Sequence, residues 1–173
     1  MRQIEGANMN DIDIRLITDK DIRGFYDALC SVASEGIYLL TTTPPAYEKK
    51  QYFVLNNIDK NNAQYVAVQK DKVIGWVDII PLERNTMTHV GHLGMGVLSE
   101  FRGLGIGTKL LNKAMEHAWN QKLTRLELEV FSDNEAAIQL YKKCDFKVEG
   151  IKKSARLFEN KYQDITIMAQ YNI

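Results

Sequence analysis

The sequence predicts an α/β protein in which helices cover both faces of one mixed β-sheet. Strand-like segments follow one another in the first half of the chain and alternate with helical segments in the second half. Neighbouring strands favour antiparallel hairpins, whereas a helix between two strands favours a parallel connection. With 173 residues, 45% of them hydrophobic and 25% charged, the chain is large enough for one domain with its own hydrophobic core.

The first half predicts a strand, two helices and three further strands. Ile12, Ile14 and Leu16 alternate with polar residues, which indicates the first strand. Thr18, with Asp21 at the capping-box position, begins a helix that runs to about residue 32. A loop at residues 41–45 precedes a helix at residues 46–58, because adjacent prolines cannot continue regular structure. Strands are predicted at residues 64–69, 73–80 and 89–98, the first two forming a hairpin.

The second half alternates helix and strand before two closing strands. The clearest helix spans residues 106–121, whose apolar residues fall on one stripe. A strand follows at residues 126–130, and Ser132 with Glu135 predicts a capping box for a helix that ends at Cys144. Residues 146–149 and 164–171 are the closing strands, so the predicted order is β-α-α-β-β-β-α-β-α-β-β.

Composition and charge exclude several classes of protein. The formal net charge is +0, so no overall field attracts nucleic acid or an anionic membrane. Cys30 and Cys144 form neither a disulfide framework nor a metal-ligand spacing, which favours a reducing cytoplasm and no metal. We find no signal peptide or membrane-spanning stretch. Residues 1–10 are expected to be a disordered extension, and residues 11–173 a single domain.

A glycine-rich segment, Arg102 to Thr108, joins a predicted strand to the amphipathic helix. Glycines at such a junction let backbone N–H groups turn inward, and the helix N-terminus adds a positive dipole end, so the segment suits a phosphate or pyrophosphate. It is no P-loop, because lysine follows Thr108, and no dinucleotide fingerprint, because Thr108 stands where the third glycine belongs. The alternative is a plain tight turn before a helix.

Two motifs resemble those of the GNAT acetyltransferase superfamily. Arg102, Gly105 and Gly107 fill its acetyl-CoA signature, and the run Leu93-Gly94-Met95-Gly96-Val97 resembles its splayed central strand. A second motif is carried by Asn134, Ala137, Leu140, Tyr141 and Phe146, although Asp145 replaces a glycine at its turn. The resemblance implies a central, mostly antiparallel sheet, splayed at its middle strands. The variable loops are similar to those of a bacterial subgroup with amino-acid and phosphinothricin-type acetyltransferases.

The resemblance implies acetyl-CoA as co-substrate and a primary amine as acceptor. A backbone N–H near Val97 would polarise the thioester carbonyl, unless Gly94 and Gly96 mark a bulge with only a shape role. The residues expected to contact the cofactor are Met95, Gly96, Val97, Leu98, Arg102, Gly103, Leu104, Gly105, Ile106, Gly107, Thr108, Asn134, Ala137, Tyr141 and Lys143. For Asn134 the alternative is a helix start, and for Lys143 a solvated surface charge.

Tyr141 and His92 are the predicted catalytic residues. The Tyr141 hydroxyl would donate to the departing sulfur, against the alternative that the ring packs in the core. His92, which precedes the splay, would accept the proton of the amine, and the alternative is a structural role for this side chain. Glu35 and His89 are the other candidates for the base. Glu35 and Tyr38 are expected to contact substrate, against an ordinary surface charge and a core aromatic.

The predicted reaction is direct transfer of acetyl from acetyl-CoA to the primary amine of a small molecule, an amino acid or a similar compound. The alternatives are a protein or peptide N-terminal acetyltransferase and a non-catalytic acyl-CoA sensor. Polyamines are less favoured, because no dense acidic cluster accompanies the substrate loops. Neither nucleic acid nor membrane is an expected partner, and analogy is compatible with a homodimer through the C-terminal strands.

Overall fold

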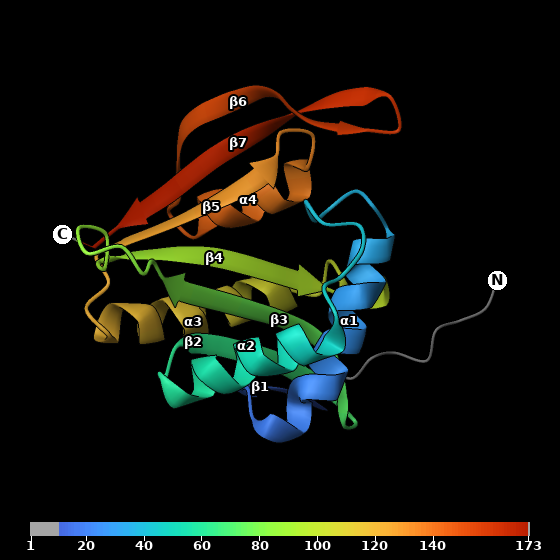
Figure 1. The fold of residues 1–173 in the computed structure, drawn as a ribbon, viewed down its shortest axis with the longest axis vertical. Helices are drawn as coiled ribbons and strands as arrows, with labels where there is room; N and C mark the ends of the chain where they lie inside the picture. Colours follow the sequence, from blue (N-terminus) through green and yellow to red (C-terminus); the bar gives the residue numbers. More distant parts are fainter. Residues whose placement is uncertain (1–10, 173) are drawn as a thin grey trace.

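Seven strands form a single sheet in residues 11–172, the part of the chain that the computed structural model describes (Figure 1). Their spatial order is β1-β2-β3-β4-β5-β7-β6, and β4 pairs with β5 in parallel while the other pairs are antiparallel. The strands are β1 (Ile12–Leu16), β2 (Ala63–Gln69), β3 (Lys72–Pro81), β4 (Val90–Val97), β5 (Arg125–Phe131), β6 (Lys147–Phe158) and β7 (Lys161–Tyr171).

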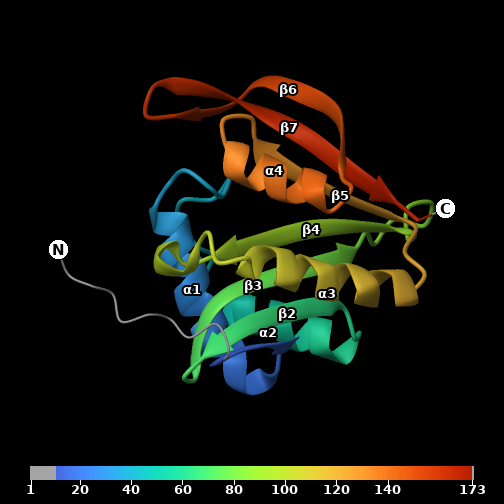
Figure 2. The same ribbon diagram turned by 180° about the vertical axis from the view of Figure 1, so that it is seen from behind.

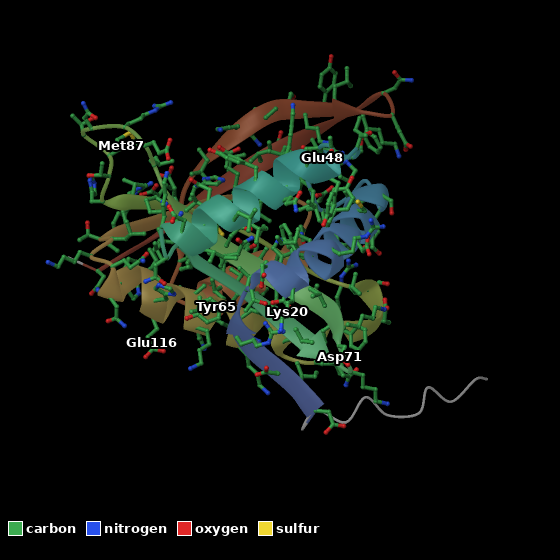
Figure 3. All side chains as sticks on the ribbon, turned by 60° about the horizontal axis from the view of Figure 1, so that its bottom comes forward. Lys20, Glu48, Tyr65, Asp71, Met87 and Glu116 are labelled. Atoms are coloured by element: carbon green, nitrogen blue, oxygen red, sulfur yellow. The ribbon has the colours of Figure 1, made fainter. Side chains whose placement is uncertain are left out.

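Helices cover both faces of this sheet, as predicted. On one face lie α1 (Ile22–Ser34) and α2 (Tyr47–Asp59), and on the other lie α3 (Ile106–Asn120) and α4 (Glu135–Lys143) (Figures 1 and 2). Phe25 of α1 packs edge-on against Trp76 of β3, with ring centroids 5.8 Å apart. On the opposite face the Tyr65 hydroxyl lies 3.2 Å from Nδ1 of His117 in α3. Figure 3 labels Tyr65 near the ribbon of α3, on which Glu116 is also labelled. The mixed α/β class and the order of elements are confirmed.

One predicted helix cap is confirmed and two later details are wrong. Thr18 and Asp21 form the predicted capping box, and the helical segment opens with a short 3-10 turn, Asp19–Asp21, before α1. Asn134, not Ser132, caps α4, because its side chain accepts from the Ala137 N–H at 3.2 Å. The closing strands β6 and β7 are much longer than predicted and form a hairpin at Glu159 and Asn160, both at positive φ. The expected disorder of residues 1–10 lies outside the described residues.

The two central strands separate along their length, and this separation positions the site. Parallel pairing of β4 with β5 ends at His92 and Glu127, although β4 stays paired with β3 as far as Val97. The remaining length of β4 therefore has a free edge that faces β5. Because the N–H of Leu98 donates to Ile74 on β3, alternation directs the N–H groups of Val97 and Met95 toward the free edge. The predicted splay of the central strand is confirmed.

Candidate functional site

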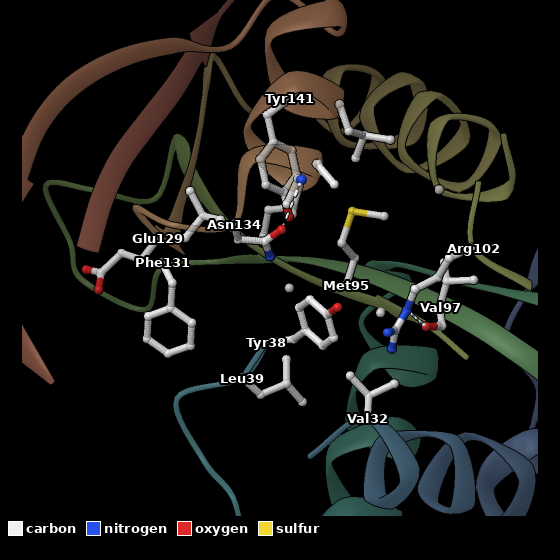
Figure 4. Close-up of a pocket in the computed structure, with 18 of the residues that line it drawn as sticks. Val32, Tyr38, Leu39, Met95, Val97, Arg102, Glu129, Phe131, Asn134 and Tyr141 are labelled. Carbon is white, nitrogen blue, oxygen red and sulfur yellow. Dashed lines mark hydrogen bonds between the residues drawn. The ribbon is translucent and has the colours of Figure 1, made fainter. Parts of the chain in front are cut away.

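A cavity of about 1030 Å³ passes through the gap between β4 and β5. Its walls come from the free half of β4, the end of β5, the start of α3, one face of α4 and the segment between α1 and α2. Figure 4 shows Tyr141 on one side of this cavity, Met95 and Val97 on β4, and Tyr38 with Leu39 on the opposite side. Elements that are distant in sequence thus meet at the splay.

Strand alternation gives the cavity two chemically different ends. Successive side chains of β4 point to opposite faces of the sheet. Met95 lies toward α3, where its methyl group is 3.4 Å from the position of a Cβ on Gly107. His92 and Gly94 therefore lie on the other face, together with Asp78, which is paired with Gly94 across β3 and β4. One end of the cavity opens beside α3 and α4, and the other opens beside α1 and α2.

The glycine-rich loop forms the phosphate-binding geometry at the first end. Gly103 and Gly105 both have φ of +76°, a left-handed conformation that favours glycine. Gly105 is the N-cap of α3, so the N–H groups of Ile106, Gly107 and Thr108 have no partner within the helix. These residues line the cavity, and a helix N-terminus with free N–H groups suits a pyrophosphate. The loop therefore fits the expected co-substrate, and the plain-turn alternative accounts for less of its geometry.

Arg102 has a different environment from the one that its place in the motif suggests. Its guanidinium pairs with both carboxylate oxygens of Glu35, at 2.8 and 2.5 Å, and its Nε donates to the Val97 carbonyl at 2.8 Å. It also lies 4.3 Å from the ring centre of Tyr38. The hydrogen bonds that Arg102 donates to Glu35 raise the pKa of the guanidinium above its usual range. The side chain is thus engaged within the protein, and a phosphate contact is left to the backbone.

The α4 residues predicted for the donor line the first end. Tyr141 is buried at 7% exposure, packs against Phe146, and points from α4 into the cavity (Figure 4). Desolvation raises the pKa of Tyr141 above its usual range, so the hydroxyl stays protonated and can donate. Asn134 both caps α4 and lines the cavity, and Lys143 lies at the same wall. The position of Tyr141 is therefore compatible both with a packing role for its ring and with a catalytic role for its hydroxyl.

The second end carries titratable groups. His92 is exposed and lines the cavity, as does Lys50 of α2. Asp78 is half-buried beside Gly94, and desolvation raises the pKa of its carboxyl to about 7, an effect that the Lys50 charge reduces. Glu129 of β5 also lines this end and is ion-paired with Lys152.

The structure does not bring every predicted residue to the cavity wall. Leu98 is buried at 4% exposure and Leu104 packs at the edge of the core, so neither lines the cavity. Glu35 lies behind Arg102, whereas Tyr38 does reach the cavity. His89 precedes β4, at the end remote from the splay, where its carbonyl accepts from Thr124. A base role for His89 is therefore contradicted by its position.

Sequence reasoning missed Asp78, Lys50 and, apart from Tyr38, the lining residues of the α1–α2 segment. Asp78 had a usable signal, because it is the single charged residue between Val73 and Ile80 in a strand that is otherwise mostly buried. The sequence offers no comparable signal for Lys50, because lysines on a helix surface are common. Among residues 11–172 no three His, Cys, Asp or Glu side chains are grouped so as to hold a metal ion. No helix in that part of the chain is long and apolar enough to cross a membrane.

Comparisons of the sequence and of the structure with known proteins indicate the same family. Residues 34–146 match the family model described as the acetyltransferase (GNAT) family. An L-amino acid N-acetyltransferase of Escherichia coli, AaaT, is 34% identical over 108 residues, which cover 62% of this chain and 67% of that protein. An acetyltransferase of the GNAT family from Streptococcus pneumoniae superposes with a TM-score of 0.86 at 27% identity, covering 93% of this chain and 99% of the other.

A phosphinothricin acetyltransferase of the GNAT superfamily from Sinorhizobium meliloti, solved in complex with acetyl-CoA, also has a TM-score of 0.86. Its identity is 17%, with 93% of this chain and 88% of that chain covered, so the likeness is one of fold.

Proposed function

Given that the chain belongs to the acetyltransferase (GNAT) family, we propose that it transfers acetyl from acetyl-CoA to the primary amine of a small molecule, an amino acid or a similar compound. The observation that carries the proposal is that one continuous cavity crosses the sheet through the splay. Its two ends would receive donor and acceptor from opposite faces, which suits direct attack in a ternary complex.

The first end suits the donor. The free N–H groups at the start of α3 would bind the pyrophosphate, and the free edge of β4 would pair with the pantetheine amides as an added strand. Acetyl-CoA supplies an activated thioester. The Val97 N–H, which faces the gap, would donate to the thioester carbonyl oxygen and stabilise the charge that develops there. The pairing of β3 with β4 has no register shift beside Gly94 or Gly96, which does not favour the bulge alternative.

The second end suits a small amine. The segment that contributes Leu40, Thr41 and Pro44 to the wall covers this end and limits its size. A cation, Lys50, and a carboxylate, Asp78, lie near one another there, which favours a zwitterion such as an amino acid. The Escherichia coli relative named for L-amino acid acetylation supports the same substrate class.

An acceptor panel tests the proposal. Purified protein is given acetyl-CoA with L-amino acids, their amides, a short peptide with a free N-terminus, and a polyamine. Released thiol and product mass are measured. We expect kcat/KM for at least one amino acid to exceed that for the peptide and polyamine tenfold or more. Turnover of peptide alone would favour N-terminal protein acetylation, and acetyl-CoA binding without turnover of any amine would favour a sensor.

Tyr141→Phe tests the role proposed for the tyrosine hydroxyl. Removal of the donor should lower kcat about 100-fold, while the KM for acetyl-CoA stays within threefold, because the ring is kept. Tyr162→Phe is the matched control, since Tyr162 is 70% exposed on β7. A loss of kcat below about threefold would assign Tyr141 to packing.

A further inference from the structure

Asp78 carries a carboxyl group at a position in β3 where the apolar surroundings disfavour its charged form. It lies in the middle of β3 among buried apolar residues, and it makes no side-chain hydrogen bond or ion pair within residues 11–172. Even a half-buried carboxylate without a hydrogen-bond partner destabilises the folded state by its partial desolvation. Nothing in the packing of β3 requires this side chain.

Gly94 gives this carboxylate access to the cavity. The two residues are opposite each other on β3 and β4, and a Cβ on Gly94 would lie 3.2 Å from Oδ1 of Asp78. Gly94 itself lines the cavity, at the point where β4 has left β5. Asp78 is not itself a wall residue of the cavity, and Gly94, which has no side chain, is the wall residue beside its carboxylate, on the face where the amine would enter.

The groups that surround Asp78 differ in charge. Lys50 faces it from α2, and His92 is its diagonal neighbour on β4, one pair beyond Gly94. On β2 the opposite residue is Gln64, which is fully buried and whose Nε2 has no hydrogen-bond partner in the described residues. From α1 the neighbouring contact is the apolar ring of Phe25 on Trp76. Glu129, across the splay, is neutralised by Lys152.

We propose that Asp78 is the general base that takes the proton from the acceptor ammonium in the reaction proposed above. Asp78 removes one proton from the ammonium, and the nitrogen lone pair forms the bond to the acetyl carbon. The carbon–sulfur bond breaks with its electron pair on sulfur, and the second nitrogen proton passes to that sulfur, to which the Tyr141 hydroxyl donates a hydrogen bond. Asp78 then returns its proton to water, for which the exposed His92 offers a relay. Base and leaving-group donor thus lie on opposite faces of the sheet.

The ionisation of Asp78 suits this role. Desolvation raises the pKa of its carboxyl to about 7, close to the working pH at which a general base is most effective. The base is active when deprotonated and acts on the ammonium form of the acceptor, so kcat/KM should rise with pH through about 7, level, and fall again above the pKa of the amine. The amine contributes its own ionisation at a pKa that depends on the acceptor.

Asp78→Asn is the direct test, with Asp71→Asn as the matched control in the exposed turn beside β3. Profiles of kcat/KM against pH are measured with two acceptors whose amino pKa values differ, an amino acid and its methyl ester. We expect Asp78→Asn to lose at least 100-fold in kcat/KM and to lose the inflection near pH 7, which in the wild type stays in place with both acceptors. CoA affinity, measured by calorimetry, should be unchanged.

A ¹³C NMR titration of the Asp78 carboxyl in the wild-type protein gives a readout that needs no turnover, and an inflection below pH 5 would overturn the proposal. A variant within threefold of wild-type kcat/KM, or one that keeps the inflection, would also overturn it. The base role rests on the proposed function, but the experiments distinguish failure of the base role from failure of the proposed function. Inactivity of the wild type on every amine would reject both, whereas equal activity of wild type and Asp78→Asn would reject the base role alone.

Discussion

At the scale of single residues, burial affects two ionisable groups on opposite faces of the sheet. Desolvation raises the pKa of Asp78 to about 7 and keeps the hydroxyl of Tyr141 protonated throughout the neutral range. The two effects have one physical cause, since a low-dielectric environment disfavours the charged form of either acid. They leave a carboxylate that can accept a proton on one side of the splay and a phenol that can donate on the other.

The raised pKa of Asp78 predicts a pH-dependent cost to stability. Between about pH 4, where the carboxyl ionises in the unfolded chain, and about pH 7, the folded protein holds more protons than the unfolded one. Stability contributed by this group therefore falls as pH rises across that window. Asp78→Asn removes the effect, which amounts to about 2.6 kcal/mol between pH 5 and pH 8, so its Tm relative to wild type should increase by about 5–10 °C over that range. A constant Tm difference, measured by calorimetry, would contradict the raised pKa.

At the scale of elements, β4 and the start of α3 depend on glycine for different reasons. A Cβ on Gly96 would lie 2.3 Å from the Trp76 ring, so the strand can pass this side chain only as glycine. A Cβ on Gly105 would meet nothing within 4 Å, and there the requirement is the left-handed φ of +76°. Gly96 therefore serves packing, whereas Gly105 sets the direction of the N–H groups at the start of α3.

Gly105→Val should raise the KM for acetyl-CoA at least tenfold. A β-branched residue in the left-handed region is strained by about 1–2 kcal/mol, so the loop would relax and turn its N–H groups away from the ligand. The KM for the amine should change less than threefold, because the acceptor end lies across the sheet. Gly150→Val on β6, where a Cβ also meets nothing within 4 Å, is the control. Unchanged kinetics in Gly105→Val would remove the loop from the donor site.

At the scale of the whole molecule, the pair of Arg102 and Glu35 joins the two layers of helices. Glu35 follows α1 on one face and Arg102 precedes α3 on the other, and their side chains are 27% and 30% exposed, respectively. Tyr38 stacks on the same guanidinium. The acceptor-side segment is thereby attached to the donor loop, so the two ends of the cavity are held in a fixed relation.

Glu35→Gln should destabilise the protein by about 2 kcal/mol, because it leaves a partly buried guanidinium without its charged acceptor. For a chain of this length that corresponds to a fall in Tm of about 4–8 °C. Glu83→Gln is the matched control, since the Glu83 side chain is 80% exposed in its pair with Lys60, and its Tm should change by less than about 2 °C. Equal Tm values for the two variants would show that the Arg102–Glu35 pair does not join the layers.

Much of the fold was determined by local sequence signals. Alternation and helical stripes predicted the order of the elements, because the periods of strands and helices are properties of the backbone. The same signals failed where the strand pattern is irregular, as in β6, whose register with β7 shifts twice and which is mostly exposed. The cap of α4 was misassigned because Ser132, Asn134 and Glu135 all suit a helix start and only the backbone selects one.

The sequence by itself determined the family motifs, the glycine loop and the residues of β4 and α4 that face the gap, since these depend on short spacings along the chain. Only the tertiary structure decided that Arg102 is bound to Glu35, which is 67 residues away, and that Asp78 lies behind Gly94. Pairings of this kind follow from strand register and from the packing of layers. Such long-range contacts leave no periodic trace in the sequence, and the assignment of donor and acceptor ends to opposite faces therefore became visible only in the folded sheet.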